Sequence, residues 1–205
     1  MLETQDALLR AIVARVRGRA SDEIASDVRV HQFLAELERT TETSSAMSIV
    51  DPATGRLLAS SIAFPPPAGG DVSNQPWLAA HRDDKTLLHV GPLTRLPQAG
   101  PTGMTVSRRD PASRLVAICV VGTDALSQPF TIVREGAHDT LTLALSDGAT
   151  LARERPGTDP FGFRLPQDTV FMRWRRGEVT LPAIDRAGID GNLRLWPLDG
   201  DDALP

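Results

Sequence analysis

The stretch TGMTVSRRDPASRLVAICVVGTD, residues 102–124, decides how the rest of the sequence is interpreted. A polar segment ends in two adjacent arginines, Asp-Pro follows and favours a turn, and an apolar run then leads to Gly-Thr-Asp. Two strands joined by so short a turn form an antiparallel hairpin. The apolar strand is expected near the centre of a sheet, and the aspartate at its end needs an explanation.

Three further strands are predicted upstream of this hairpin. The first two flank DPATG, which places Pro and Gly at turn positions. A short helix with Asn74 as cap and Pro76 in its first turn should precede the third strand. The segments are AMSIV (46–50), RLLASSIAF (56–64), QPWLAAHRDD (75–84) and TLLHVGPL (86–93). Five antiparallel strands with helical residues between the second and third are the order of a PAS-like sheet, in which the hairpin forms strands four and five.

Helical spacing of apolar residues characterises the N-terminal region, residues 4–42. Gly18 interrupts this pattern, and Ser21 followed by two acids is typical of a new helix start. We expect one long bent helix or two helices in line. The apolar stripe of this region needs a partner, either the rest of the domain or a second copy in a homodimer.

Residues beyond the hairpin predict a second, smaller β-rich lobe. A helix is expected over DALSQPFTIVRE, and DTLTLALS and ATLARER flank a turn as two strands. TVFMRWRR (169–176) alternates like a strand, and GNLRLWPL (191–198) is the last strand predicted. The predicted fold class is therefore α+β: a long N-terminal helix (1–45), a five-stranded PAS-like lobe (46–135) and a smaller lobe (136–205).

The composition of the 205 residues is that of a soluble globular protein. The formal net charge of −4 gives no sign of a nucleic-acid partner. Cys119 is the single cysteine, so no internal disulfide forms, and its apolar surroundings predict a buried, inert thiol. No apolar run approaches the roughly 18 residues of a membrane helix. No signal peptide is visible, so the chain is expected to be cytosolic or a soluble piece of something larger.

Several segments together resemble double-Cache domains. SIVDPATGRLLASS resembles their first hairpin, DVSNQPWLAAHRDD their short-helix segment, and LALSDGATLARERPG the start of their second lobe. The 102–124 hairpin and the LLHVGPL strand before it resemble the three strands that come after the short helix in that family, and the resemblance is best over residues 46–157. It implies an extracytoplasmic sensor of a bacterial diguanylate cyclase, histidine kinase or chemoreceptor, located in the periplasm as part of an inner-membrane protein.

The resemblance also implies a small-molecule site between the sheet and the short helix. Amino-acid-binding members have Arg-x-Trp-Tyr and a distal Asp, whose arginine and acid pair with the carboxylate and ammonium groups of the ligand. That pattern falls here on Gln75 to Leu78, and only Trp77 and Asp124 match, which argues against α-amino acids. The residues expected to bind a ligand are Trp77, His81, Arg82, His89, Thr105, Ser107 and Asp124.

Each of these residues also has a purely structural interpretation. Trp77 suits a core, and Asp124 suits the N-cap of the following helix. His81 and His89 lie eight apart without a carboxylate at metal spacing, so no metal site is predicted. A triad of Ser107, His81 and Asp124 lacks a nucleophile elbow, and no cofactor motif is present, so no enzyme is predicted. Three hypotheses remain: a ligand-binding sensor, a ligandless dimerisation module and a small hydrolase.

Overall fold

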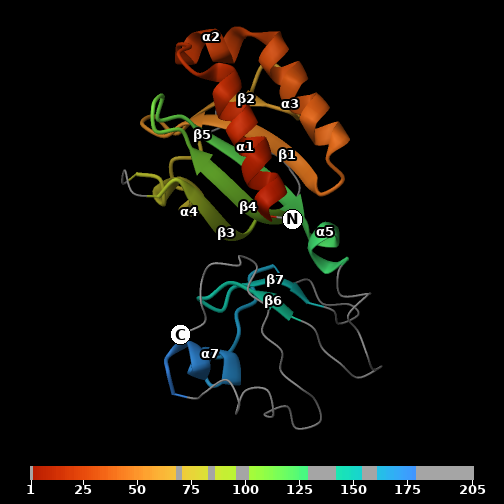
Figure 1. Cartoon of the computed structure of the whole chain (residues 1–205), viewed down its shortest axis with the longest axis vertical. Helices are drawn as coiled ribbons and strands as arrows, with labels where there is room; N and C mark the ends of the chain where they lie inside the picture. The colour runs from red at the N-terminus through yellow and green to blue at the C-terminus, as the bar shows by residue number, and fades with distance from the viewer. Residues whose placement is uncertain are drawn as a thin grey trace. The chain divides into compact units, whose positions relative to one another are not determined.

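The structure is a computed structural model, which describes residues 2–67, 71–82, 86–95, 102–128, 142–153 and 161–178. The chain divides into two compact units (Figure 1): almost all of the chain up to Leu126 forms the first, and Ser127 onwards forms the second. The predicted lobe boundary at residue 135 lies outside the described residues.

A five-stranded antiparallel sheet forms the centre of the first unit. Its strands have the spatial order β2-β1-β5-β4-β3, so the polar and apolar strands of the 102–124 hairpin are neighbours and β5 is the central strand. The predicted α+β class and the place of this hairpin as strands four and five are thereby confirmed. The strands are β1 (Ser44–Asp51), β2 (Arg56–Ser60), β3 (Leu88–Arg95), β4 (Thr102–Arg109) and β5 (Val116–Gly122).

The N-terminal region is a helical hairpin, and the expectation of one bent helix or two helices in line was wrong. It consists of α1 (Leu2–Val16), α2 (Ser21–Ser26) and α3 (Val28–Thr40), and α1 and α3 run in opposite directions (Figure 1). Gly18 follows the end of α1 and has a φ of +77°, which is the left-handed conformation. Glycine adopts this conformation without the steric strain that a Cβ atom causes, and it is the usual residue at such helix ends. The Asp27 carboxylate then caps α3 by accepting a hydrogen bond from the Arg29 N–H.

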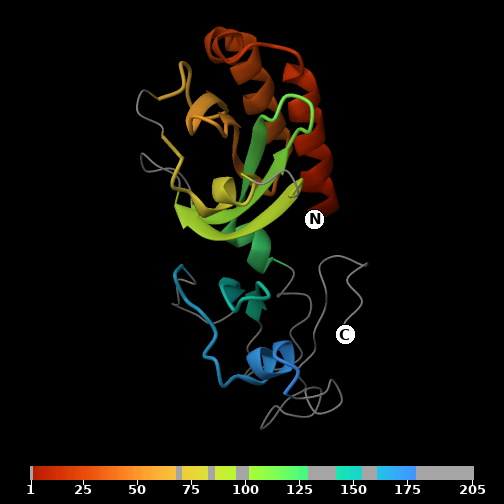
Figure 2. The same cartoon turned by 90° about the vertical axis from the view of Figure 1, so that its left-hand side faces the viewer.

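Two different layers cover the two faces of this sheet (Figure 2). The α1–α3 hairpin lies on one face, which Cys119 of β5 and Arg108 of β4 reach through contacts with α1. On the other face, α4 (Pro76–Ala79) places Trp77 and Leu78 in a buried apolar cluster with residues of β1 and β5. Pro76 occupies the first turn of α4 as predicted, but the N-cap is Gln75 and not Asn74.

The second unit contains a small two-stranded sheet and a short helix. Strands β6 (Thr142–Ala144) and β7 (Thr150–Arg153) form the predicted antiparallel hairpin. TVFMRWRR is not a strand but contains α7 (Val170–Arg175), because Thr169 caps the Met172 N–H and Gly177 follows at φ +73°. The expected GNLRLWPL strand lies outside the described residues, and the helix expected over DALSQPFTIVRE is described only as α5 (Thr123–Ser127).

No helix in the described parts of the chain combines the length and the apolar character needed to cross a membrane.

Candidate functional site

A buried hydrogen bond between His81 and Ser107 lies on the α4 side of the sheet. The imidazole of His81, just beyond α4, places Nε2 2.8 Å from the Ser107 hydroxyl of β4 and Nδ1 3.0 Å from the Thr86 carbonyl. A carbonyl can only accept, so Nδ1 carries the proton. When His81 is neutral, Nε2 therefore accepts from the Ser107 hydroxyl. The Ser107 hydroxyl oxygen also lies 3.5 Å from the His89 carbonyl oxygen.

A second imidazole, that of His89, lies beside the first. The ring centroids of His81 and His89 are 6.2 Å apart and the rings are almost perpendicular. Burial lowers the pKa of both imidazoles. For His81, the positive charge of Arg109 lowers the pKa further, as does that of His89 whenever its imidazole is protonated, although the hydrogen bonds to Thr86 and Ser107 oppose this. Both side chains are therefore neutral at pH 7.

Thr105 presents a hydroxyl on the same face of β4 as Ser107, because side chains two residues apart in a strand point the same way. Thr105 is fully buried, and its Oγ1 atom has no hydrogen-bond partner. The backbone of Gly91 passes directly against this hydroxyl: a Cβ built on Gly91 would collide with Thr105 Oγ1 and lie 3.6 Å from His89 Nε2. Only glycine at position 91 leaves room for the Thr105 hydroxyl where it is.

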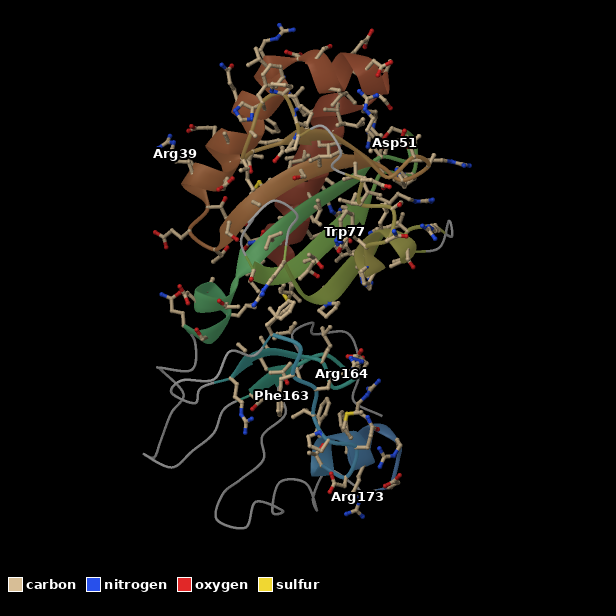
Figure 3. All side chains as sticks on the ribbon, turned by 180° about the vertical axis from the view of Figure 1, so that it is seen from behind. Arg39, Asp51, Trp77, Phe163, Arg164 and Arg173 are labelled. Atoms are coloured by element: carbon tan, nitrogen blue, oxygen red, sulfur yellow. The ribbon has the colours of Figure 1, made fainter. Side chains whose placement is uncertain are left out.

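We call the side chains of His81, His89, Thr105 and Ser107 the histidine–hydroxyl cluster. Trp77 packs over the same face of the sheet, since Ile118, a member of its apolar cluster, is the cross-strand partner of Ser107 (Figure 3). The indole is 1% exposed, as a core residue would be, yet its Nε1 atom has no hydrogen-bond partner. The Thr105 hydroxyl and the Trp77 indole N–H, both buried on this face, thus lack the partner that such groups normally have.

Arg82 and Asp124 do not join the other predicted site residues. Arg82 is exposed and donates a hydrogen bond to the Ser73 carbonyl at 2.7 Å. Asp124 is exposed in the first turn of α5, which follows the end of β5 that pairs with Gly103, away from Ser107. Asp124 is also not the N-cap, because α5 begins at Thr123.

The catalytic triad that the sequence allows on paper is not assembled. His81 does contact Ser107, but its Nδ1 atom faces the Thr86 carbonyl rather than the carboxylate of Asp124. The described residues also contain no group of three or more His, Cys, Asp or Glu side chains arranged to hold a metal ion.

The paired arginines and one glycine have roles that the sequence did not predict. Arg108 forms an ion pair with Asp6 of α1, and Arg109 is buried on the cluster face instead of being solvated. Alternation along β4 could have indicated that the two arginines point to opposite faces. Gly91 within a predicted strand was the available signal for a close backbone approach.

Comparisons with known proteins find a likeness in structure only. No family model matches the chain, and no curated protein matches it. Among solved structures, the extracellular domain of the putative histidine kinase rpHK1S-Z16 superposes with a TM-score of 0.69 at 20% sequence identity. The match covers 84% of this chain and 69% of that one.

This likeness defines the class of fold. The chain has an α+β fold, with the N-terminal helices on one face of a five-stranded antiparallel sheet and a small second sheet. This arrangement is similar to the fold of the rpHK1S-Z16 extracellular domain.

Proposed function

We propose that this chain is the extracytoplasmic ligand-sensing domain of a membrane-bound signalling protein, and that it binds a small polar molecule at the histidine–hydroxyl cluster. The fold shared with the extracellular domain of a putative histidine kinase supports the sensing role and favours a kinase over a diguanylate cyclase or a chemoreceptor as the parent protein. The double-Cache resemblance of residues 46–157 also supports the sensing role, and it is compatible with all three kinds of parent protein.

The observation that carries this proposal is that polar side chains are fully buried on the α4 face of the sheet. His81, Thr105 and Ser107 are each 1% exposed or less, and apolar residues are the usual occupants of such positions. A buried hydroxyl or N–H without a partner destabilises a protein by about 1–3 kcal/mol. Buried polar groups that lack a partner in the unliganded protein are typical of a binding site in which the ligand supplies the missing hydrogen bonds. Here they lie on the α4 side of the sheet.

Contacts on the opposite face of the sheet connect the cluster to α1. Gln5 of α1 donates a hydrogen bond to Thr43, and its side-chain oxygen accepts from Cys119 at 3.1 Å. Asp6 of α1 pairs with Arg108, the residue next to Ser107. A ligand that favoured one arrangement of β4 would therefore also favour one position of α1 against the sheet. We propose that the signal passes through α1 to the parent protein.

The ligandless dimerisation module has weaker support. It was suggested by the apolar stripe of the N-terminal region, but α1 already buries that stripe within a single chain, as the 0–4% exposure of Leu9, Ile12, Val13 and Val16 shows. A homodimer through the N-terminal helices remains a proposal. A hydrolase is disfavoured because the carboxylate expected to orient His81 is replaced by a carbonyl.

A thermal-shift screen of organic acids, amino acids, amines and neutral amides tests the proposal. A compound that binds the native state raises the unfolding midpoint as its concentration increases. A hit that uses the cluster loses its effect in Thr105→Val and keeps it in Thr142→Val, an exposed threonine of β6. No hit, together with a concentration-dependent dimer in sedimentation, would favour the dimerisation module. Ester hydrolysis that disappears in Ser107→Ala would favour the hydrolase.

A further inference from the structure

The unpartnered groups on the cluster face restrict which ligands can complete it. The indole Nε1 of Trp77 is a donor only, so its missing partner is an acceptor. The Thr105 hydroxyl donates one hydrogen bond and accepts others, so it suits either kind of partner. A ligand that satisfies both groups must carry at least one acceptor atom and gains from carrying a donor as well.

The charge state of the surroundings restricts the ligand further. His81 and His89 are neutral at pH 7, because burial lowers the pKa of each. Arg109 is also buried on this face, where it has an interaction of its own. An ion buried beside the two neutral imidazoles loses its hydration without gaining a paired charge from them, which costs far more than burying a neutral amide.

The described acidic side chains near this part of the sheet are already engaged. Asp110 accepts hydrogen bonds from Arg17 and Ser113, and Asp71 accepts one from the Ser73 N–H. Asp124, the acid expected to hold an ammonium group, lies beyond the other end of β5. An amino acid or amine therefore finds no free carboxylate among the described residues of this face.

Resting on the proposed function, the geometry points to an uncharged ligand that both accepts and donates hydrogen bonds, as a carboxamide or a ureide does. Its carbonyl oxygen accepts from Trp77 Nε1–H, and the Thr105 hydroxyl pairs with its polar end. Neutral His89, whose Nε2 atom lies on the same side of Gly91 as the Thr105 hydroxyl, supplies a further donor or acceptor.

Three compounds of the same shape and different charge test this inference: acetamide, acetate and acetamidinium. Each is titrated into the full chain at pH 7 while the indole N–H signals are followed by ¹H–¹⁵N NMR. Trp77→Phe assigns the Trp77 signal, and Trp174 and Trp196 are internal controls. We expect acetamide to move the Trp77 signal selectively and to bind at least about tenfold more tightly than either ion, a factor that corresponds to 1.4 kcal/mol.

Variants at position 105 test the hydroxyl. Thr105→Val should weaken acetamide binding about three- to tenfold, the effect of one neutral hydrogen bond. Thr105→Ser, which keeps the hydroxyl, should restore most of it, and Thr142→Val should leave it unchanged.

The possible failures are distinguishable. If acetate or acetamidinium moves the Trp77 signal more strongly than acetamide, the uncharged class is refuted while the sensing function stands. If none of the three compounds moves the signal, or if Thr105→Val leaves acetamide binding intact, the inference is also refuted. If no compound in the broad thermal-shift screen stabilises the protein, the proposed function itself fails.

Discussion

Replacing Thr105 by valine should make the unliganded protein more stable, although it removes a polar group from the candidate site. Valine has nearly the shape of threonine, so the substitution deletes the hydroxyl without opening a cavity. That hydroxyl is fully buried and has no hydrogen-bond partner. Removing an unsatisfied buried polar group recovers its desolvation penalty, about 1–3 kcal/mol.

Ser107→Ala is the matched comparison, because the two hydroxyls lie two residues apart on the same face of β4. The Ser107 hydroxyl is bonded to His81 Nε2 at 2.8 Å, so its removal leaves a buried acceptor unpaired. That change should lower the free energy of unfolding by about 1–3 kcal/mol. The two variants should therefore differ by roughly 4 kcal/mol, with opposite signs relative to the wild type.

Urea unfolding of the wild type and the two variants measures this difference. A change in stability alone shifts the midpoint and leaves the slope unchanged. In thermal unfolding the corresponding shift is about 2–4 °C per kcal/mol for a protein of this size. If Thr105→Val proves less stable than the wild type, the Thr105 hydroxyl is satisfied in the unliganded protein. The reasoning that makes the cluster a binding site would then be refuted.

Three further predictions concern the buried ionisable groups. The pKa of folded His81 is lowered by burial below the ordinary 6.5, so the unfolded chain binds more protons just below pH 6.5. Stability should therefore fall as the pH falls below about 6.5, and His81→Gln should flatten that slope in urea titrations at several pH values. Burial raises the pKa of Cys119 to about 12, so Ellman's reagent should react with this thiol only as fast as the protein opens. Asp110→Ala should destabilise by about 2–3 kcal/mol in urea unfolding, because it breaks charge-assisted hydrogen bonds. Arg17→Ala should cost less than about 1 kcal/mol, because the Arg17 side chain is 57% exposed.

The sheet of the first unit was predictable from the sequence because its signals are local. Turn residues at DPATG and at Asp110-Pro111 fix two hairpins, and the apolar run of β5 fixes the central strand. The direction of the N-terminal helices was not predictable in the same way. Periodicity reports which residues face the core, but the reversal depends on the positive φ of Gly18 and the cap at Asp27.

TVFMRWRR shows a different limit of the sequence. Six to eight residues with an apolar side chain at every second position fit a strand, but so short a run also fits a helix with one side buried. The Thr169 cap and Gly177 decide for α7, and both are visible in the sequence. The helix signals lay at the two ends of the segment rather than in its alternation.

The candidate site was predictable only where its residues follow from strand alternation. Thr105 and Ser107 were expected on one face of β4, and His81 and His89, which were also predicted as site residues, lie beside them. Arg82 and Asp124 entered the prediction through sequence proximity or the double-Cache pattern. Neither reason determines where a side chain points, and the structure places both away from the cluster.

The unpartnered groups also set the scale of signal that a ligand can produce. Pairing Trp77 Nε1 and the Thr105 hydroxyl removes two penalties of about 1–3 kcal/mol each, or roughly 2–6 kcal/mol together. Moving a two-state equilibrium from 1:99 to 99:1 requires about 5.5 kcal/mol of differential affinity. A ligand that pairs both groups in only one arrangement of β4 comes close to this value, whereas one that pairs a single group does not. Because Ser107 and Arg108 are consecutive residues on opposite faces of β4, the same strand that presents the cluster also holds Asp6 of α1. A ligand must therefore pair with both groups if its binding is to shift α1 almost entirely from one position to the other.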